Sequence, residues 1–443
     1  MDKKNIDSVY KANLCHYCGI CYGVCPKDNI EFEPDDTGNP VFRVKDDHRC
    51  GACELCYIVC PGRELNFTSL HRQVFYYDYT PGLLGSFIDC SLAHSKDSTL
   101  RRKAASGGVV SSLLISALEA GKIDGATVVK LGADDNPLKT TPFIARKKDE
   151  ILSACGSKYL TVPMGVVLRE IWQSSKEQHY AFVGLPCHVH GLRKAQQLIP
   201  RLERRVGPVI SLFCGRGSSP VATEFVLKWL RLKMEEVDKI DYRYGKWPGG
   251  FAATLKTGQI VFLPLDDYVF IMKMFQNIRC AMCTDHTGEF ADISIGDAWL
   301  KGLKGQEGWN AVIARTPLGR NILRATQQDE RIRVFATHPS SIIESQKLML
   351  YDKKIKIFAS LKIARWLHLS HTIPQYTGLM PVYKPDCSVY LRALIFMVVP
   401  RLAAATSLRS LLILVFKLPL KLLKMDLKAK DKCVTKGIQK LSR

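Results

Sequence analysis

Residues 15–26 have the sequence Cys-His-Tyr-Cys-Gly-Ile-Cys-Tyr-Gly-Val-Cys-Pro, and the same spacing of four cysteines and a proline recurs over residues 50–61. Two gaps of two residues let three thiolates of a quartet converge on one [4Fe–4S] cubane, whereas the fourth thiolate, after a gap of three, turns toward the neighbouring cubane. The spacing therefore predicts two clusters. Their expected ligands are Cys15, Cys18, Cys21 and Cys60 for the first, and Cys50, Cys53, Cys56 and Cys25 for the second.

A pair of zinc sites is the alternative interpretation of these quartets. Four-cysteine zinc sites usually combine two separated CxxC pairs, however, and not three ligands at one interval. The duplicated motif is typical of bacterial ferredoxins. Residues 29–49, with apolar residues on both sides of the turn at 36–39, fit the short hairpin between two half-repeats. We therefore predict a ferredoxin domain with two [4Fe–4S] clusters over residues 1–70, which alone can only relay electrons.

Length and composition define the broader class of the chain. Its 443 residues are 47% hydrophobic and 24% charged, which is typical of a globular protein and argues against wholesale disorder or a multispanning membrane protein. The length predicts about three domains. Residues 1–13 are polar and lack the apolar core of a secretory signal, so we expect a cytoplasmic location. In that reducing compartment the 16 cysteines are expected to bind metal and not to form disulfides.

The middle of the chain alternates between helical and strand-like patterns. Residues 126–131, 180–184 and 208–213 are expected to form strands, and apolar residues at helical spacing predict helices over 109–118 and 221–234. The first helix follows Ser106-Gly-Gly, and the serine is expected to cap it. Such alternation predicts an α/β fold with a partly parallel sheet covered by helices.

Two further cysteines directly follow two of the expected strands. Cys187 comes after the strand at 180–184, and Cys214 comes after the strand at 208–213. Open α/β sheets bind ligands beyond the carboxyl ends of their strands, so both thiols are expected at one crevice. With the CxxC pair Cys280 and Cys283 they supply four thiolates, enough for a third [4Fe–4S] cluster. Two buried structural cysteines with an unrelated CxxC, or a redox dithiol, remain alternatives on spacing alone.

Several segments between roughly residues 90 and 300 carry a resemblance to a known family. The most specific is Cys-Ala-Met-Cys-Thr-Asp-His-Thr-Gly-Glu-Phe-Ala-Asp-Ile-Ser-Ile-Gly-Asp at 280–297, and others include Gly-Leu-Pro-Cys at 184–187 and Trp-Pro-Gly-Gly-Phe at 247–251. With these segments the chain resembles the family of coenzyme F-420 hydrogenase/dehydrogenase beta subunits, in its version with a fused N-terminal double-cluster ferredoxin. The resemblance implies an α/β (α+β) multidomain chain. Its expected regions are the ferredoxin domain, an N-terminal-like region at 85–175, a C-terminal-like region at 176–345 and a basic amphipathic helical extension at 346–443.

The resemblance also implies cofactors and an activity. It implies a flavoprotein that binds FAD beside a [4Fe–4S] cluster, which favours the third cluster over its alternatives. A flavin accepts two electrons as hydride and passes them on singly, whereas each cubane carries one electron. We therefore expect an oxidoreductase in which the flavin exchanges hydride with reduced F-420 or another conjugated small molecule. Its expected protein partner is a ferredoxin or a dehydrogenase complex. The alternative is a noncatalytic electron-transfer subunit that docks to a partner or a membrane complex.

Candidate FAD contacts lie in two segments. The chain has no GxGxxG fingerprint, and the best phosphate-binding candidate is Ser106-Gly107-Gly108. Two glycines at a helix start let backbone N–H groups approach a phosphate, although the same residues also suit a plain helix cap. Lys158 and Tyr159 could contact the flavin by charge and by stacking, or be a solvated lysine and a core tyrosine.

Several other polar residues in the matched segments receive no catalytic role. His188 and His190 are interpreted as histidines bonded to backbone at a helix start and not as proton donors, because no partner can be named. The aspartates at 285, 292 and 297 are expected at most to orient the cluster loop. No function is assigned to the remaining cysteines, Cys90, Cys155, Cys387 and Cys433.

The C-terminal segment is strongly basic. The chain has a formal net charge of +21, and residues 388–443 hold 12 Lys or Arg but only two acidic residues. Residues 391–423 are apolar, yet basic residues and two prolines interrupt them, so no spanning helix is expected. Such a segment suits peripheral contact with the inner face of an anionic membrane. Helices packed on the core with a solvated tail fit equally well. Nucleic-acid binding is not expected because no recognition motif accompanies the charge.

Overall fold

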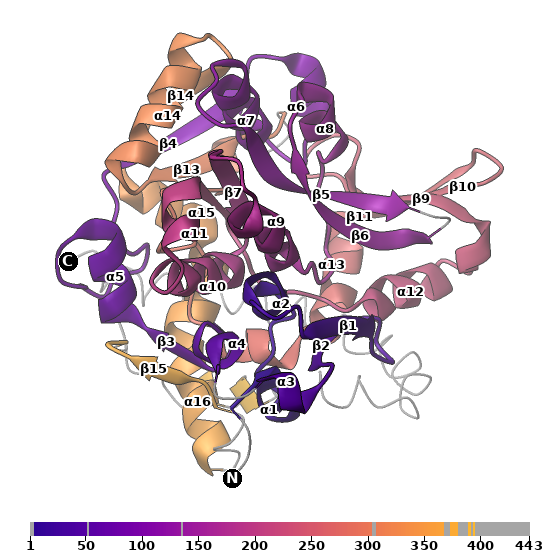
Figure 1. The fold of residues 1–443 in the computed structure, drawn as a ribbon. Helices are drawn as coiled ribbons and strands as arrows, with labels where there is room; N and C mark the ends of the chain where they lie inside the picture. The colour runs from indigo at the N-terminus through magenta and orange to yellow at the C-terminus, as the bar shows by residue number, and fades with distance from the viewer. Residues whose placement is uncertain are drawn as a thin grey trace.

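A mixed eight-stranded sheet forms the centre of the molecule (Figure 1). The computed structural model describes residues 4–50, 53–133, 136–303, 307–366, 373–379, 389–390 and 393–394. The strand order of the eight-stranded sheet is β14-β4-β13-β12-β8-β7-β5-β6. These strands are β4 (Asp89–Ser95), β5 (Gly125–Ala133), β6 (Asn136–Ala145), β7 (Tyr180–Gly184), β8 (Val206–Leu212), β12 (Ile293–Asp297), β13 (Asn310–Ala314) and β14 (Ile332–Ala336).

The middle of this sheet is parallel, as the alternating pattern predicted. Strands β5, β7, β8 and β12 run in the same direction, and antiparallel strands flank them on both sides. Successive side chains of β7 point to opposite faces. Tyr180 and Phe182 join one apolar cluster, and Ala181 and Val183 join the other. Both faces are therefore covered, which explains why every residue of β7 is buried.

Helices from different parts of the chain cover the two faces. One face carries α7 (Val109–Glu119) and α14 (Pro317–Gln328), whose apolar residues share a cluster with β5 and β12. The other face carries α9 (Leu168–Gln173), α10 (Pro186–Gln196) and α11 (Pro200–Arg205). Two short helices, α6 (Ser98–Lys103) and α8 (Lys148–Ser153), complete the first half of the chain.

The N-terminal segment contains short elements around the two cysteine quartets. They are α1 (Ile6–Lys11), α2 (Ile20–Val24), β1 (Ile30–Pro34), β2 (Pro40–Val44), α3 (Asp47–Cys50), α4 (Leu55–Ile58), β3 (Glu64–Asn66) and α5 (Phe67–Phe75). Strands β1 and β2 pair antiparallel, with Phe32 opposite Phe42. This pairing confirms the hairpin predicted between the quartets.

The N-terminal segment packs directly on the central unit and not through a loose tether. Gly165, in the short 3₁₀ helix at Met164–Val167, lies so close to α2 that a Cβ on it would be 2.4 Å from the backbone nitrogen of Ile20. A Cβ on Gly23 would be 2.0 Å from the carbonyl oxygen of Gly165. The indole Nε1 of Trp172 donates to the carbonyl of Gly23 at 2.7 Å. These backbone contacts fix the position of the quartets relative to the sheet.

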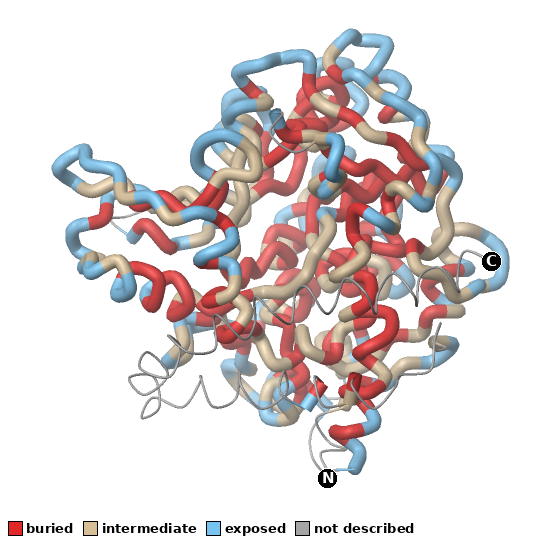
Figure 2. The backbone as a smooth tube through the Cα atoms, turned by 180° about the vertical axis from the view of Figure 1, so that it is seen from behind, coloured by how far each residue is buried: buried red, intermediate tan, exposed pale blue. Residues whose placement is uncertain are grey.

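A smaller unit projects from the side of the molecule (Figure 1). It consists of a three-stranded sheet, β9 (Val237–Tyr244), β10 (Gly250–Leu255) and β11 (Ile260–Pro264), with α12 (Pro220–Trp229) and α13 (Leu265–Met274). Its interior is a separate apolar cluster, and its outer loops are exposed (Figure 2). The helix predicted over 221–234 ends at Trp229, because Arg231 adopts a left-handed backbone conformation with φ of 59°.

The described C-terminal elements pack against the rest of the chain. Helix α15 (Pro339–Tyr351) continues into a π-helical turn, η5 (Asp352–Lys356), and then α16 (Ile357–Trp366). Helix α15 crosses the boundary predicted at residue 345. Strand β15 (Gln375–Thr377) pairs with β3 of the N-terminal segment. Apart from residues 389–390 and 393–394, the segment for which membrane contact was predicted, 388–443, lies outside the described residues. Among the residues that are described, no helix has the length and apolarity needed to span a bilayer.

Candidate cofactor sites

The structure brings the N-terminal cysteines together in two groups, Cys15, Cys18, Cys21 and Cys60, and Cys25, Cys50, Cys53 and Cys56. Burial and the nearby thiols of Cys60 and Cys18 raise the pKa of Cys15 well above its usual value. Burial raises the pKa of Cys56 to about 12, and the thiols of Cys50, Cys25 and Cys53 also act in that direction. The fourth cysteine of each quartet therefore lies with the first three of the other.

Each of these two spatial groups of cysteines has features that suit a cluster. A cavity of about 340 Å³ is bordered by Cys25, Cys50, Cys53 and Cys56. Backbone N–H groups point at sulfur: that of Tyr17 donates to Cys15 Sγ at 3.2 Å, and that of Asn29 donates to Cys25 Sγ at 3.3 Å. Hydrogen bonds to cluster sulfurs are among the features that tune an iron–sulfur centre.

The four scattered cysteines also come together. Cys187 lies in the first turn of α10, directly after β7, and Cys214 follows β8. Cys280 and Cys283 lie in and just after a 3₁₀ turn, η3 (Ile278–Met282). Burial raises the pKa of the Cys187 thiol well above its usual value, and the neighbouring thiols include all three of the others. The N–H of Gly217 donates to Cys280 Sγ at 3.4 Å.

No single-ion site accompanies these thiol groups. Within the described ranges, no three Cys, His, Asp or Glu side chains are arranged to hold one metal ion. That finding concerns a single ion, whereas the four thiolates of a cubane each bind a different iron.

The N-terminal quartets and the scattered cysteines meet at a shared boundary. Cys18 is among the thiols that act on Cys187. The guanidinium of Arg279, which is fully buried beside Cys280, donates to the carbonyl of Gly62 at 2.7 Å. Asn277 Nδ2 donates to the carbonyl of Cys15 at 3.1 Å. Residues next to the cysteines of one group therefore hold the backbone next to the cysteines of the other.

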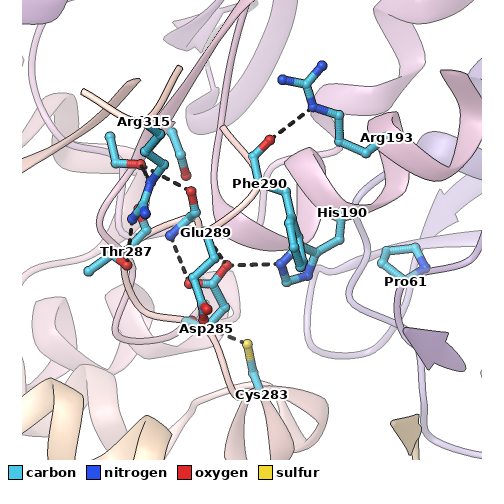
Figure 3. Close-up of polar contacts among 12 residues, drawn as sticks. Pro61, His190, Arg193, Cys283, Asp285, Thr287, Glu289, Phe290 and Arg315 are labelled. Carbon is cyan, nitrogen blue, oxygen red and sulfur yellow. Dashed lines mark hydrogen bonds and ion pairs between the residues drawn. The ribbon is translucent and has the colours of Figure 1, made fainter. Parts of the chain in front are cut away.

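The loop after Cys283 is held by a buried carboxylate (Figure 3). Asp285 Oδ2 accepts from His190 Nε2 at 2.9 Å, and the carboxylate also accepts the N–H groups of Gly288 and Glu289. Burial alone would raise the pKa of Asp285, but the hydrogen bond and charge of His190 hold it well below its usual range. The expectation that His190 bonds only to backbone is wrong, because its partner lies 95 residues away on this loop.

Two other polar residues of the matched segments, His188 and Asp292, form hydrogen bonds that hold neighbouring elements together. The N–H of Leu185 donates to His188 Nδ1 at 3.0 Å, and His188 Nε2 donates to the carbonyl of Val162 at 3.0 Å. These bonds confirm its predicted role at the helix start. Asp292 accepts from the N–H of Val209 and from Arg193, and thereby joins β8 to the end of the loop after Cys283.

A second cavity, of about 360 Å³, opens at the carboxyl ends of the parallel strands. Gly184, Leu212 and Asp297, at the ends of β7, β8 and β12, all line it. So does Cys214, one of the four grouped thiols. Ligand sites of open α/β sheets lie at this edge. The cavity therefore meets the grouped thiols at Cys214, and the resemblance places a flavin beside such a group.

Two of the three residues of the predicted FAD segment at 106–108 line this cavity, but Ser106 does not cap the helix as predicted. Ser106 and Gly108 line it, whereas Gly107 packs against β4 and β13, where a Cβ would be 2.6 Å from Asn310 Oδ1. The prediction that Ser106 caps α7 is wrong. Its hydroxyl donates to the carbonyl of Trp309 at 2.7 Å, and Gly108, at φ of 74°, is the residue that starts the helix.

The second predicted FAD segment also borders the cavity. The ammonium of Lys158 donates to the carbonyls of Cys155 and Gly156 at 3.1 and 3.0 Å, and burial lowers its pKa to about 8. It is therefore not a solvated lysine. Tyr159 packs beside Tyr242, and its hydroxyl is 3.2 Å from a guanidinium nitrogen of Arg243.

Sequence reasoning missed several residues that line this cavity. They are Cys155, Arg216, Arg243 and Asn310. Arg243 is 7% exposed, pairs with Asp297 at 2.6 Å, and keeps one guanidinium nitrogen without a hydrogen-bond partner. Arg216 lies two residues after Cys214, a predicted cluster ligand, so adjacency could have indicated it. Nothing in the spacing around Arg243 marks it.

Fold and site together define an α/β protein that has a cavity at the carboxyl ends of its strands, lined in part by one of the grouped cysteines. The chain belongs to the family of coenzyme F-420 hydrogenase/dehydrogenase beta subunits. The model of the N-terminal part of that subunit matches residues 90–169, and the model of its C terminus matches residues 177–339. Together they cover more than half of the chain.

Individual relatives give the same result. The chain is 28% identical over 265 residues to the coenzyme F-420 hydrogenase subunit beta of Methanothermobacter thermautotrophicus, covering 58% of this chain and 86% of that protein. It is 24% identical over 346 residues to a subunit of the F(420)H(2) dehydrogenase of Methanosarcina mazei, covering 74% and 86%. A chain of the F-420-reducing [NiFe] hydrogenase complex from Methanosarcina barkeri superposes with a TM-score of 0.52 at 23% identity, covering 68% of this chain and 98% of that one. The last likeness concerns the fold.

Proposed function

We propose that the protein is an iron–sulfur flavoprotein oxidoreductase that passes electrons between three [4Fe–4S] clusters and an FAD. The observation that carries this proposal is the position of Cys214. It is grouped with Cys187, Cys280 and Cys283 and also lines the 360 Å³ cavity. A cluster on these thiols would therefore adjoin a molecule bound in that cavity.

The three groups of thiols form a sequence from the surface inward. The group of Cys25, Cys50, Cys53 and Cys56, here called the second set, includes the exposed Cys53. The first set is Cys15, Cys18, Cys21 and Cys60, and the third is Cys187, Cys214, Cys280 and Cys283. In the first set all four cysteines are buried, and one of them, Cys18, neighbours Cys187 of the third set. We infer that electrons enter or leave at the exposed set and pass through the buried one. The redox partner, a ferredoxin or a dehydrogenase complex, would then dock near Cys53.

The residues that border the cavity fit an FAD. The backbone around Ser106 and Gly108, at the start of α7, offers the dipole and the close approach that a phosphate needs. Arg243, whose charge Asp297 compensates, adds a guanidinium nitrogen that has no hydrogen-bond partner of its own. When bound, the flavin would supply conversion between hydride and single-electron transfer. The protein's own part is to hold that ring system next to Cys214 and to keep bulk water from the apolar strand ends.

The names of the relatives indicate the small-molecule partner. One is a coenzyme F-420 hydrogenase subunit, and the other is a component of an F(420)H(2) dehydrogenase. We propose hydride exchange with reduced F-420 or another conjugated molecule. The same names, which describe parts of larger enzymes, support a second candidate: an electron-transfer subunit that is active only in a complex. Turnover of reduced F-420 with an artificial electron acceptor by the isolated protein would favour the first candidate over the second.

Cofactor content tests the central proposal. Anaerobically purified protein is expected to contain about 12 iron atoms and one FAD per chain, because three cubanes and one flavin site are proposed. Iron and acid-labile sulfide assays, together with flavin released by denaturation, measure both quantities. A content near eight iron atoms would contradict the third cluster. About 12 iron atoms with no flavin, in protein purified under several conditions, would contradict the flavoprotein assignment.

Filling the cavity should expel the flavin without affecting iron. Ser111, on α7, is partly buried and lines the cavity, so Ser111→Trp is expected to reduce bound FAD at least about tenfold, as overpacking costs 1–3 kcal/mol or more. Flavin absorbance against iron content gives the ratio. Ser153→Trp, at an exposed position on α8, is the matched control and should retain FAD. Full flavin content in Ser111→Trp would place the FAD elsewhere.

A further inference from the structure

Three lysines are buried in the π-helical turn between α15 and α16. Lys353, Lys354 and Lys356 are 5%, 3% and 7% exposed. Single π-helical turns inside helices are frequent at functional sites. This turn lies beyond residue 339, where the match to the family model ends.

Two of these lysines have carboxylate partners. Lys354 pairs with Glu289, which itself is buried in the loop after Cys283. Lys356 pairs with Asp352 at 2.5 Å. Their charges are therefore compensated locally, as is usual for buried ammonium groups.

Lys353 differs from its neighbours. Its Nζ donates to the carbonyl oxygen of Cys280 at 3.0 Å, and among the described residues no carboxylate pairs with it. The ionisable groups that act most strongly on it are the thiols of Cys283, Cys280 and Cys214, and the guanidinium of Arg216. The side chain therefore brings a buried positive charge to the group of cysteines proposed to hold the third cluster.

A buried ammonium without a counter-charge is strongly unfavourable. Four thiolates around a cubane would supply that negative charge. Reduction adds one more negative charge to the cluster, so a cation fixed beside it stabilises the reduced form more than the oxidised form. Net charge and hydrogen bonds to the sulfurs are among the determinants of cluster potential.

We propose that Lys353 raises the reduction potential of the cluster held by Cys187, Cys214, Cys280 and Cys283. The inference rests on the third cluster of the proposed function. It assigns to a residue outside the matched family region a role in setting how readily electrons move from the N-terminal clusters toward the cavity. Lys353 acts through the cluster's electrostatic surroundings and is not expected to contact substrate.

The test is an anaerobic redox titration of the complete holoprotein, monitored by electron paramagnetic resonance. In Lys353→Met and Lys353→Gln one of the three cluster signals should shift to a lower midpoint potential, and the other two should stay in place. Glutamine can still donate to the Cys280 carbonyl but has no charge. Lys353→Arg, which keeps the charge, should titrate close to the wild type. Lys362→Met, which removes a charge from an exposed position on α16, is the control and should change nothing.

Unchanged midpoints in iron-replete Lys353→Met or Lys353→Gln would overturn the inference. Loss of about four iron atoms in both neutral variants would also overturn it, since Lys353 would then hold the loop and not tune the cluster. Failure of the underlying proposal has a different signature. If the wild type itself shows only two cluster signals and about eight iron atoms, the third cluster is absent whatever residue occupies position 353.

Discussion

Replacing Cys187 with alanine should remove one whole cluster. Iron content is expected to fall from about 12 to about eight atoms per chain, because a cubane that loses one of its thiolates, here at the start of α10, is poorly held. The N-terminal clusters should remain, since the other eight ligands are untouched. Electron flow from an external ferredoxin to the flavin should fall to background. Iron analysis, electron paramagnetic resonance and stopped-flow reduction of the flavin measure the three effects.

Cys90→Ala is the matched control for this change. Cys90 is buried, at 7% exposure, whereas Cys187 is partly buried, and Cys90 lies on β4 and is not among the thiols acting on Cys187. It should retain all iron and full flavin reduction. Retention of about 12 iron atoms in Cys187→Ala would remove Cys187 from the ligand set and, with it, the proposed link between the quartets and the cavity.

Replacing Gly165 with alanine should separate the N-terminal segment from the sheet. The new methyl would lie 2.4 Å from the nitrogen of Ile20 and 2.6 Å from its Cα, and backbone atoms cannot rotate out of the way. Overpacking of this kind costs about 1–3 kcal/mol and sometimes more. We expect a clearly lower melting temperature, faster proteolysis between the N-terminal segment and β4, and slower electron transfer into the third cluster.

Substitutions at two other glycines serve as comparisons for Gly165→Ala. A Cβ on Gly191 would meet only the side chain of Ile20, at 2.7 Å, and a side chain can shift, so Gly191→Ala should cost less. Gly302 has open space around its Cβ position, and Gly302→Ala should melt like the wild type. If Gly165→Ala were as stable and as resistant to protease as Gly302→Ala, the close packing of α2 on this turn would not be what holds the segment.

Local patterns predicted those parts of the molecule in which structure depends on neighbours in sequence. The quartets and the hairpin with Phe32 opposite Phe42 follow from spacing and turn chemistry within a few residues. The positions of Cys187 and Cys214 followed from a general rule about strand ends in α/β sheets. The π-helical turn had no such signal, because Asp-Lys-Lys-Ile-Lys at 352–356 has the composition of a solvated surface segment.

Tertiary contacts decided what the sequence alone could not show. His190 contacts Asp285 because α10 and the loop after Cys283 pack together. No pattern in the sequence links the two residues, which are 95 positions apart. Ser106 has the usual identity of a helix cap, yet the left-handed Gly108 takes that position and frees the hydroxyl for Trp309. Arg243 reaches the cavity from the smaller sheet, whose strands gave no indication of a site.

The pairing of β15 with β3 bears on how the protein is made. β3 follows the second quartet, and its strand partner at 375–377 is synthesised some three hundred residues later. Tyr376 of that strand donates to the carbonyl of Met282 and accepts from Arg279, so it joins both cysteine-bearing regions. On the ribosome, where N-terminal regions emerge first, the early cysteines must therefore wait for nearly all of the described chain before their surroundings are complete. A cluster bound by these cysteines would therefore have its complete protein surroundings only late in the synthesis of each chain.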